Sequence, residues 1–133
     1  MSDLDKITVQ QIMRQEVNEV DGSIDVMEAM RIMKRVGATC LIVKKRYDQD
    51  EYGMLLFSDI AKQVIAKDRA PERVNVYEIM DKPVITVRPD MNIRHCARLF
   101  EKFGISHAPV VENDMVIGVV SYYLLVLGGL DLE

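Results

Sequence analysis

The chain has 133 residues, 49% of them hydrophobic and 29% charged, which is enough for one compact domain or two small interdependent halves. Its net charge of −4, with Lys44–Arg46 as the densest basic run, argues against binding to nucleic acids or anionic membranes. No apolar stretch approaches the roughly 20 residues of a membrane span, and residues 1–6 lack the features of a signal peptide. We therefore expect a cytoplasmic protein.

An internal repeat is the most informative feature of the sequence. A shift of 67 positions places Val9–Met13 on Val76–Met80, and the register holds without a gap as far as Val43. The first copy then carries two extra residues before Gly53 meets Gly118. Repetition of this kind indicates two related structural units. The predicted boundaries are a first repeat at 1–67, a linker at 68–75, a second repeat at 76–127 and a tail at 128–133.

Each copy begins with a short helix and an extended Val-x-x-Val segment, which a longer central helix follows. The central helix is predicted from apolar residues spaced i, i+3, i+4, i+7. These stripes are Val26, Ala29, Met30 and Met33 in the first copy, and Ile93, Cys96, Ala97 and Phe100 in the second. We expect Ser23 and Asp90 to cap the helices through side-chain oxygens. Gly37 and Gly104 follow where a residue with positive φ commonly ends a helix.

Two strands and a closing helix complete each copy. The predicted strands cover 39–43 and 53–57, then 105–111 and 116–122, and the predicted closing helices cover 58–67 and 122–127. Gly128 and Gly129 are expected to stop the last helix. One repeat alone buries too little surface to be stable. We therefore predict an α/β fold in which two pseudo-twofold-related repeats pack through short β-sheets, with the helices outside.

The ordered motifs, each present in related form in both copies, resemble a tandem pair of cystathionine-β-synthase-type (CBS) domains, also called a Bateman module. They include Ile-Met before Val-x-x-Val, the segment Gly104–Val111 and the segment Gly53–Ile60, and the resemblance extends over residues 9–127. It implies a regulatory module and not an enzyme. Such a module has no resident cofactor, and it binds AMP, ADP, ATP or S-adenosylmethionine between the repeats. It also forms homodimers and signals to a regulated protein, here unknown.

In nucleotide-binding members, the resemblance implies a signature Gly-h-h-(Ser/Thr)-x-x-Asp, where h is apolar. Its hydroxyl faces phosphate and its carboxylate accepts hydrogen bonds from ribose. The first copy keeps Asp59 but has Leu56 at the hydroxyl position, whereas the second keeps Ser121 but has Leu124 at the Asp position. The implied clefts mix both repeats. The preferred ribose cleft would contain Asp59, Ser58, Thr39, Asn75, Met80, Ile105 and Ser106. The other would contain Ser121, Tyr123, Ser106, Thr8, Met13, Ala38 and Thr39.

Several site residues also have a purely structural interpretation. Asp59 could cap the closing helix, and His107 could make a structural hydrogen bond. Cys40 and Cys96 are expected in the core. The sequence has no clustered metal ligands and no Ser/His/Asp set, Walker loop or GxGxxG motif. Because neither copy keeps both signature residues, the alternative function is a ligand-free dimerisation or interaction module whose nucleotide sites have decayed, and a small enzyme is the third possibility.

The closing helices predict an exposed apolar patch, which usually marks an interface. Its members would be Phe57, Ile60, Tyr122, Tyr123 and Leu125. A twofold homodimer is the commonest arrangement that covers such a surface.

Overall fold

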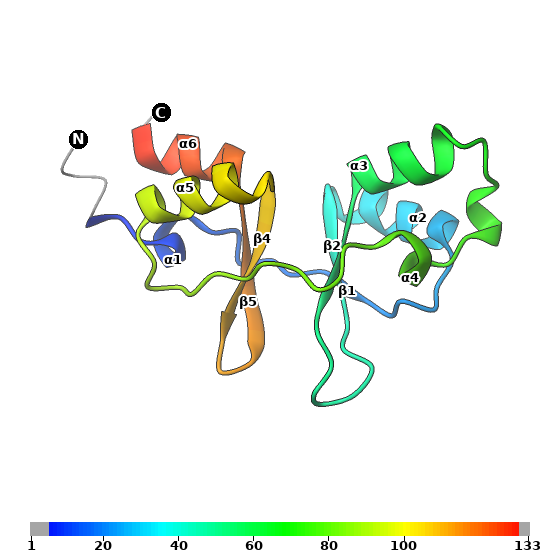
Figure 1. The fold of residues 1–133 in the computed structure, drawn as a ribbon, viewed down its shortest axis with the longest axis horizontal. Helices are drawn as coiled ribbons and strands as arrows, with labels where there is room; N and C mark the ends of the chain where they lie inside the picture. Colours follow the sequence, from blue (N-terminus) through cyan, green and yellow to red (C-terminus); the bar gives the residue numbers. More distant parts are fainter. Residues whose placement is uncertain (1–5, 131–133) are drawn as a thin grey trace. The chain divides into compact units, whose positions relative to one another are not determined.

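The chain forms two compact units that do not coincide with its sequence repeats (Figure 1). The computed structural model describes residues 6–130. Unit 1 combines the segment up to Val17 with the segment from Ile85 onward, and unit 2 is Asn18–Val84. The opening helix of each repeat therefore packs in the unit that holds the strands of the other repeat. Residues 1–5, which entered the signal-peptide prediction, and the last three residues of the predicted tail lie outside the described residues.

Unit 2 consists of a small mixed sheet and the helices that follow its strands. Its elements are β1 (Glu19–Val20), α2 (Val26–Val36), β2 (Cys40–Val43), β3 (Gly53–Leu56), α3 (Phe57–Ile60), the π-helical turn η2 (Ala61–Ile65), the 3-10 turn η3 (Pro71–Arg73) and α4 (Val76–Ile79). Strand β2 lies in the middle, parallel to β1 and antiparallel to β3. In the β2–β3 register Cys40 faces Leu56 and Val43 faces Gly53.

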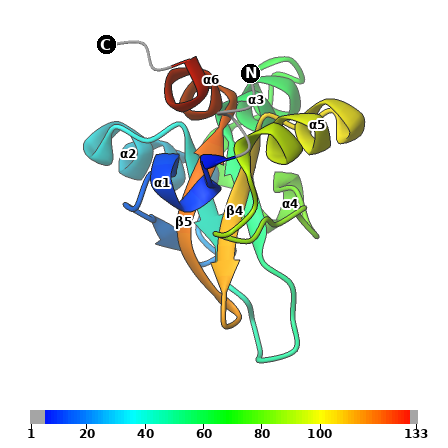
Figure 2. The same ribbon diagram turned by 90° about the vertical axis from the view of Figure 1, so that its left-hand side faces the viewer.

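Unit 1 repeats this plan around an antiparallel pair of strands (Figure 2). Its elements are α1 (Val9–Ile12), α5 (Ile93–Phe103), β4 (His107–Glu112), β5 (Met115–Ser121) and α6 (Tyr122–Leu130). His107 faces Ser121 at one end of the pair, and Glu112 faces Met115 at the other. Val87 adds a single parallel bridge to Val110, in the place that β1 occupies in unit 2.

The cores of the two units confirm the predicted apolar stripes. Val26, Ala29 and Met33 are at most 1% exposed in unit 2. Their counterparts Ile93, Cys96 and Phe100 are at most 3% exposed in unit 1, while Met30 and Ala97 pack at the edges of the two cores. A fully buried side chain of this size contributes about 1.5–3 kcal/mol to folding. The central helices are therefore held mainly by burial of one face against the sheet.

The predicted helix caps at Ser23 and Asp90 are wrong, because each central helix begins two residues later. The caps are Asp25, whose Oδ1 accepts from the backbone N–H of Glu28 at 2.9 Å, and Asn92, whose Oδ1 accepts from that of His95 at 2.9 Å. In unit 2, the backbone N–H of Ser23 instead donates to Asp21 in the turn before the helix. The predicted C-terminal ends are confirmed, because Gly37 has φ 70° and Gly104 has φ 64°.

The predicted stop of the last helix at Gly128 is also wrong, since α6 continues to Leu130. A Cβ on Gly128 would overlap the side chain of Ile12 in α1. The glycine therefore permits close approach of α6 and α1, and the helix-breaking tendency of Gly128 is outweighed by this packing.

Candidate functional site

The predicted site residues divide evenly between the two units. Unit 2 contains Ala38, Thr39, Ser58, Asp59, Asn75 and Met80, and unit 1 contains Thr8, Met13, Ile105, Ser106, Ser121 and Tyr123. Each predicted cleft draws on both groups, so its complete set of residues stays a prediction. Within each unit, the structure brings a smaller set together at one end of the strands.

In unit 2 this end is formed where β2 begins and β3 runs into α3. The backbone N–H of Phe57 donates to the carbonyl oxygen of Thr39 at 3.2 Å, which fixes the two segments side by side. Asp59 lies in the first turn of α3, where its Oδ2 accepts from the backbone N–H of Leu56 at 2.9 Å. The capping role left open by the sequence is therefore present. Ser58 and Thr39 are exposed beside it.

The carboxyl group of Asp59 is held in an unusual electrostatic environment. Burial raises the pKa of Asp59 to about 6, and a hydrogen bond and charge repulsion from Asp81 act in the same direction against the opposing bond from Leu56. Asp81 is placed by backbone hydrogen bonds in both directions with Met54, at 2.9 and 2.8 Å. The sequence analysis missed Asp81, although it directly follows the Ile-Met motif. Asp59 therefore changes its charge at a pH closer to neutrality than an ordinary carboxyl group does.

Unit 1 builds the corresponding end with hydroxyl groups. The backbone N–H of Tyr122 donates to the carbonyl oxygen of Ser106 at 3.3 Å, and Ser121 Oγ accepts from the backbone N–H of Leu124 at 3.3 Å. Ser106 Oγ also lies 2.8 Å from His107 Nδ1. His107 thus makes a structural hydrogen bond, and burial lowers its pKa, which favours the neutral ring. Tyr123 is 70% exposed on α6.

The remaining predicted residues lie at other places within their units. Thr8 and Asn75 precede α1 and α4, where their backbones pair with Asn92 and Asp25 respectively. Ala38 follows Gly37, the C-terminal cap of α2, and its N–H donates to the carbonyl oxygen of Met33. Ile105 is half-buried at the edge of the unit 1 core.

Met13 and Met80 pack on glycines inside the strands. A Cβ on Gly118 would meet Met13 Sδ at 2.5 Å, and one on Gly53 would meet Met80 Sδ at 2.7 Å. Gly53 starts β3 and Asp59 follows its end, so about 10 Å of strand separates the backbone at Gly53 from the α3 junction. The side chain of Met80 therefore contacts the far end of β3.

The predicted apolar patch is confirmed for three residues and wrong for two. Phe57, Tyr122 and Tyr123 are 49%, 42% and 70% exposed. Ile60 and Leu125 are only 4% and 6% exposed, because each packs into the core of its unit. Val126 and Leu130, which are 48% and 56% exposed, extend the apolar surface of α6 instead.

Residues 6–130 carry neither a cluster of metal ligands nor a helix suited to a membrane. In this part of the chain, no group of three or more His, Cys, Asp or Glu side chains could hold a metal ion. Over the same residues, none of the helices combines the length and the apolar character required to cross a membrane.

Both repeats of the chain match one domain family. The model of the CBS domain matches residues 9–66 and 76–126, so the chain belongs to the CBS domain family and carries two copies. A hexameric CBS-CP12 protein from bloom-forming cyanobacteria is 35% identical, with a TM-score of 0.90 over 92% of this chain and 71% of that one. The predicted α/β fold of a CBS pair is thereby confirmed.

Two other relatives bear on ligands and on chemistry. The CBS pair of protein MJ0100, solved with 5′-methylthioadenosine and S-adenosyl-L-methionine, is 26% identical, with a TM-score of 0.77 over 90% of this chain and 96% of that one. A homoserine O-acetyltransferase of Methanosalsum zhilinae is 38% identical over 88% of this chain, but this covers only 23% of the acetyltransferase. The chain thus spans less than a quarter of that enzyme's length, and the acetyltransferase name describes a much longer protein.

Proposed function

We propose that this CBS pair is a regulatory module, not an enzyme, that binds an adenosine-type ligand and signals its presence to a partner protein. The class of ligand is supported by the related pair that binds 5′-methylthioadenosine and S-adenosyl-L-methionine. AMP, ADP and ATP belong to the same proposal because they share the adenosine group. The proposed compartment is the cytoplasm, where the thiols of Cys40 and Cys96 would stay reduced.

One observation carries the proposal for the ligand. Asp59 presents a carboxyl group at the β3–α3 junction, at the family's ribose position, beside the exposed Thr39 and Ser58. A carboxylate accepts strong hydrogen bonds from vicinal hydroxyl groups such as those of ribose. Asp59 Oδ2 also caps α3, so the carboxyl group is fixed in orientation before a ligand arrives. A preoriented acceptor loses less entropy on binding.

The role of Asp59 is tested by calorimetry with 5′-methylthioadenosine, S-adenosylmethionine, AMP, ADP and ATP. Asp59→Asn keeps a capping oxygen but replaces the carboxylate by a weaker acceptor. Because a hydrogen bond to a charged group contributes about 1.5–3 kcal/mol, we expect affinity to fall roughly tenfold or more. Leu124→Asp adds the missing carboxylate beside Ser121 and should strengthen any binding to unit 1.

Equal binding of all five compounds by wild type and Asp59→Asn would contradict the ribose role. Binding of none of them by either protein would instead favour the alternative, an interaction module without a ligand. Asp48→Asn serves as a matched control, because Asp48 is an exposed carboxylate of the β2–β3 loop and not of the site. It should leave affinity unchanged.

We also propose that α6 provides a homodimer surface. Tyr123, Val126 and Leu130 expose apolar side chains on this helix, next to a cavity of about 520 Å³ between α5 and α6. The hexameric relative shows that a CBS protein of this fold can self-associate. Light scattering should give a dimer for wild type and a shift toward monomer for Val126→Asp. A wild-type mass near 15.2 kDa at micromolar concentration would refute the proposal.

A further inference from the structure

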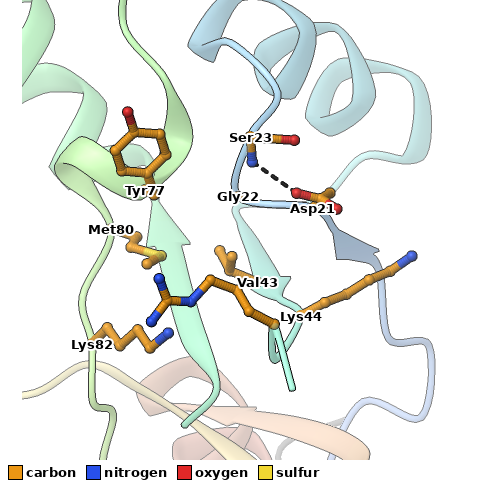
Figure 3. A pocket seen from close by; sticks show the side chains of 9 residues that line it. Asp21, Gly22, Ser23, Val43, Lys44, Tyr77, Met80 and Lys82 are labelled. Carbon is orange, nitrogen blue, oxygen red and sulfur yellow. Dashed lines mark hydrogen bonds between the residues drawn. The ribbon is translucent and has the colours of Figure 1, made fainter. Parts of the chain in front are cut away.

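Unit 2 contains a second cavity, at the end of the strands away from Asp59 (Figure 3). Its volume is about 440 Å³. We call it the basic pocket, and it is lined by Asp21, Gly22, Ser23, Val43, Lys44, Arg46, Tyr77, Met80 and Lys82. Val43 ends β2 and faces Gly53 in the register, whereas Thr39 and Asp59 lie beyond the opposite ends of the same strands. About 10 Å of strand backbone therefore separates the basic pocket from the Asp59 site.

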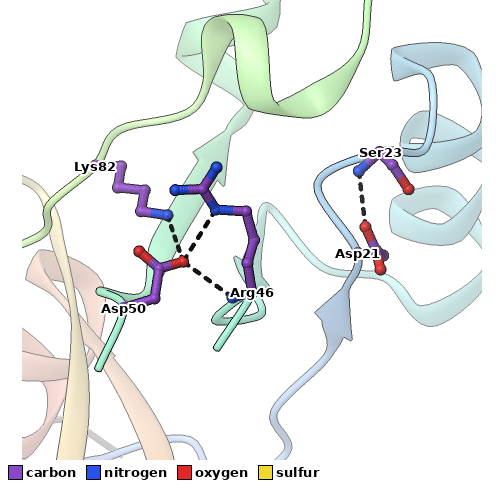
Figure 4. Close-up of polar contacts among 5 residues, drawn as sticks. All are labelled: Asp21, Ser23, Arg46, Asp50 and Lys82. Carbon is purple, nitrogen blue, oxygen red and sulfur yellow. Dashed lines mark hydrogen bonds and ion pairs between the residues drawn. The ribbon is translucent and has the colours of Figure 1, made fainter. Parts of the chain in front are cut away.

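The polar wall of the basic pocket is built around a buried carboxylate (Figure 4). Asp50 Oδ2 accepts from Lys82 Nζ at 2.8 Å, from the backbone N–H of Arg46 at 2.9 Å and from Arg46 Nε at 3.2 Å. The Asp50 side chain is only 5% exposed, and these bonds, that from Lys82 foremost, hold its pKa well below its usual range. Asp50 therefore stays ionised and fixes the positions of both cationic groups.

Asp50 does not exhaust the binding capacity of its two partners. A lysine ammonium carries three donors and a guanidinium carries five, whereas Asp50 engages one side-chain donor of each. The pocket lining holds three cations and one carboxylate, Asp21, and Asp50 lies behind the lining against Arg46 and Lys82, so that these five side chains carry one net positive charge. Lys82 is only 19% exposed, so its charge is weakly screened by water. This wall is suited to one additional oxyanion.

The pocket also has an apolar part. It is formed by Val43, Met80 and the ring of Tyr77 (Figure 3). Gly22 completes the base: a Cβ there would lie 3.2 Å from Val43 Cγ1 and 3.4 Å from Tyr77 Cβ, so the turn and α4 approach closely. The pocket thus combines fixed cations with a surface on which a small apolar or aromatic group can pack.

The equivalent positions of unit 1 do not carry these charges. In the repeat register, Lys44 corresponds to Val111 and Lys82 to Gln15. Arg46 and Asp50 lie between Val43 and Gly53, in a segment that is two residues longer than the corresponding segment between Val110 and Gly118. The cationic wall is therefore a feature of unit 2 and not a consequence of the repeated fold.

We propose that the basic pocket binds a small organic oxyanion, a molecule with one carboxylate or phosphate group attached to an apolar body. The terminal nitrogens of Arg46 and the ammonium of Lys82 bind the oxyanion, since a guanidinium matches two oxygens of such a group. Tyr77 and Met80 contact the apolar body. This proposal does not depend on the Asp59 site, because the two sites share no polar side chain.

The test uses the full chain and four probes in an NMR titration with backbone amide detection. Benzoate and phenyl phosphate carry an oxyanion and an aromatic ring, benzyl alcohol carries only the ring, and inorganic phosphate carries only the charge. We expect shifts at Gly22, Ser23, Lys44 and Tyr77, with Kd on the order of 1 mM for the better of the two aromatic anions. Benzyl alcohol and inorganic phosphate should bind at least about fivefold more weakly. Whichever of benzoate and phenyl phosphate binds more tightly identifies the preferred anionic group.

Arg46→Ala is the informative variant, because the Arg46 side chain is 72% exposed and its backbone N–H still donates to Asp50. It should weaken the binding of the better aromatic anion about fivefold or more. Arg46→Gln, which keeps a long polar side chain, should have the same effect. Arg35→Ala is the matched control, since it removes one exposed positive charge at the far end of α2. It should change affinity less than twofold. Equal binding by wild type and both Arg46 variants, or no shift at the four amides with any probe, would overturn the proposal.

Discussion

Units 1 and 2 are built from the same elements but differ in the charges at both ends of their strands. Near α3, unit 2 places Asp59 and Asp81 together, whereas unit 1 has Leu124 and Arg14 at the corresponding positions. At the other end, Asp50 joins Lys82 and Arg46 in unit 2, while unit 1 has an exposed Arg88–Asp90 pair in the neighbouring turn. The duplicated scaffold therefore tolerates divergent polar groups where strands join loops, because the apolar core supplies its stability.

The largest effect is expected when core residues at equivalent positions of the two units are replaced by alanine. Phe100 is 0% exposed in unit 1, and its counterpart Met33 is 1% exposed in unit 2. Phe100→Ala should lower the free energy of unfolding by about 4 kcal/mol and Met33→Ala by about 3 kcal/mol, because the phenyl ring leaves the larger cavity. Chemical denaturation measures both. A greater loss for Met33→Ala would show that the two cores are not packed equivalently.

The next comparison concerns the paired strand glycines. A Cβ on Gly118 would lie 2.9 Å from the backbone carbonyl oxygen of Arg14 and would also contact Met13. A Cβ on Gly53 would instead make its shortest contact with the side chain of Met80. A thioether can move aside more easily than backbone. Gly118→Ala should therefore destabilise the protein by about 2 kcal/mol and Gly53→Ala by about 1 kcal/mol or less. Similar losses, measured by the same denaturation method, would argue that Met80 cannot move.

A smaller effect is expected in the pH dependence of the unfolding free energy, to which Asp59 of unit 2 contributes. The pKa of Asp59 is raised to about 6, above the value of about 3.9 for an unfolded chain. The folded state thus binds this proton more tightly, and its contribution to stability is complete below about pH 4 and lost as the pH rises through about 6. Asp59→Asn should flatten the measured dependence of unfolding free energy on pH in this window. A carboxyl ¹³C titration of Asp59 with a midpoint near 4 would contradict this.

The same titration should affect ligand binding. A ribose donates to the ionised carboxylate, so the affinity for an adenosine-type ligand should fall as the pH drops below about 6. Calorimetry at several pH values measures the change in wild type, and Asp59→Asn is the control that should lose this dependence. An unchanged affinity across this pH range would show that the ligand does not bind to the carboxyl group of Asp59.

The smallest effect is expected at the exposed ion pair of unit 1. The Arg88 and Asp90 side chains are 79% and 70% exposed, and pairs of this kind contribute little because water and salt screen them. Asp90→Asn should leave the melting temperature unchanged within error. A clear decrease would mean that this turn supports unit 1 as Asp50 supports the loop of unit 2.

Features that depend on local pattern follow from the amino-acid sequence alone. The spacing of Val26, Ala29 and Met33 is enough to specify a helix with one buried face, because 3.6 residues complete a turn. Gly37 and Gly104 were identified as helix ends because positive φ is costly for other residues. The repeat and its ordered motifs also identified the CBS pair, and Asp59 is proposed as the ribose position because it stands in one of those motifs.

Features that join distant segments of the chain depend on the three-dimensional fold. The opening helix of each repeat packs in the unit of the other, and Asp81 reaches Asp59 through the backbone pairing with Met54. Lys82 meets Asp50 across 32 residues, which no local pattern records. Gly128 continues a helix because Ile12 lies against it. Periodicity encodes which face of an element is buried, whereas the partner of each polar or close-packed group depends on which elements the fold brings together.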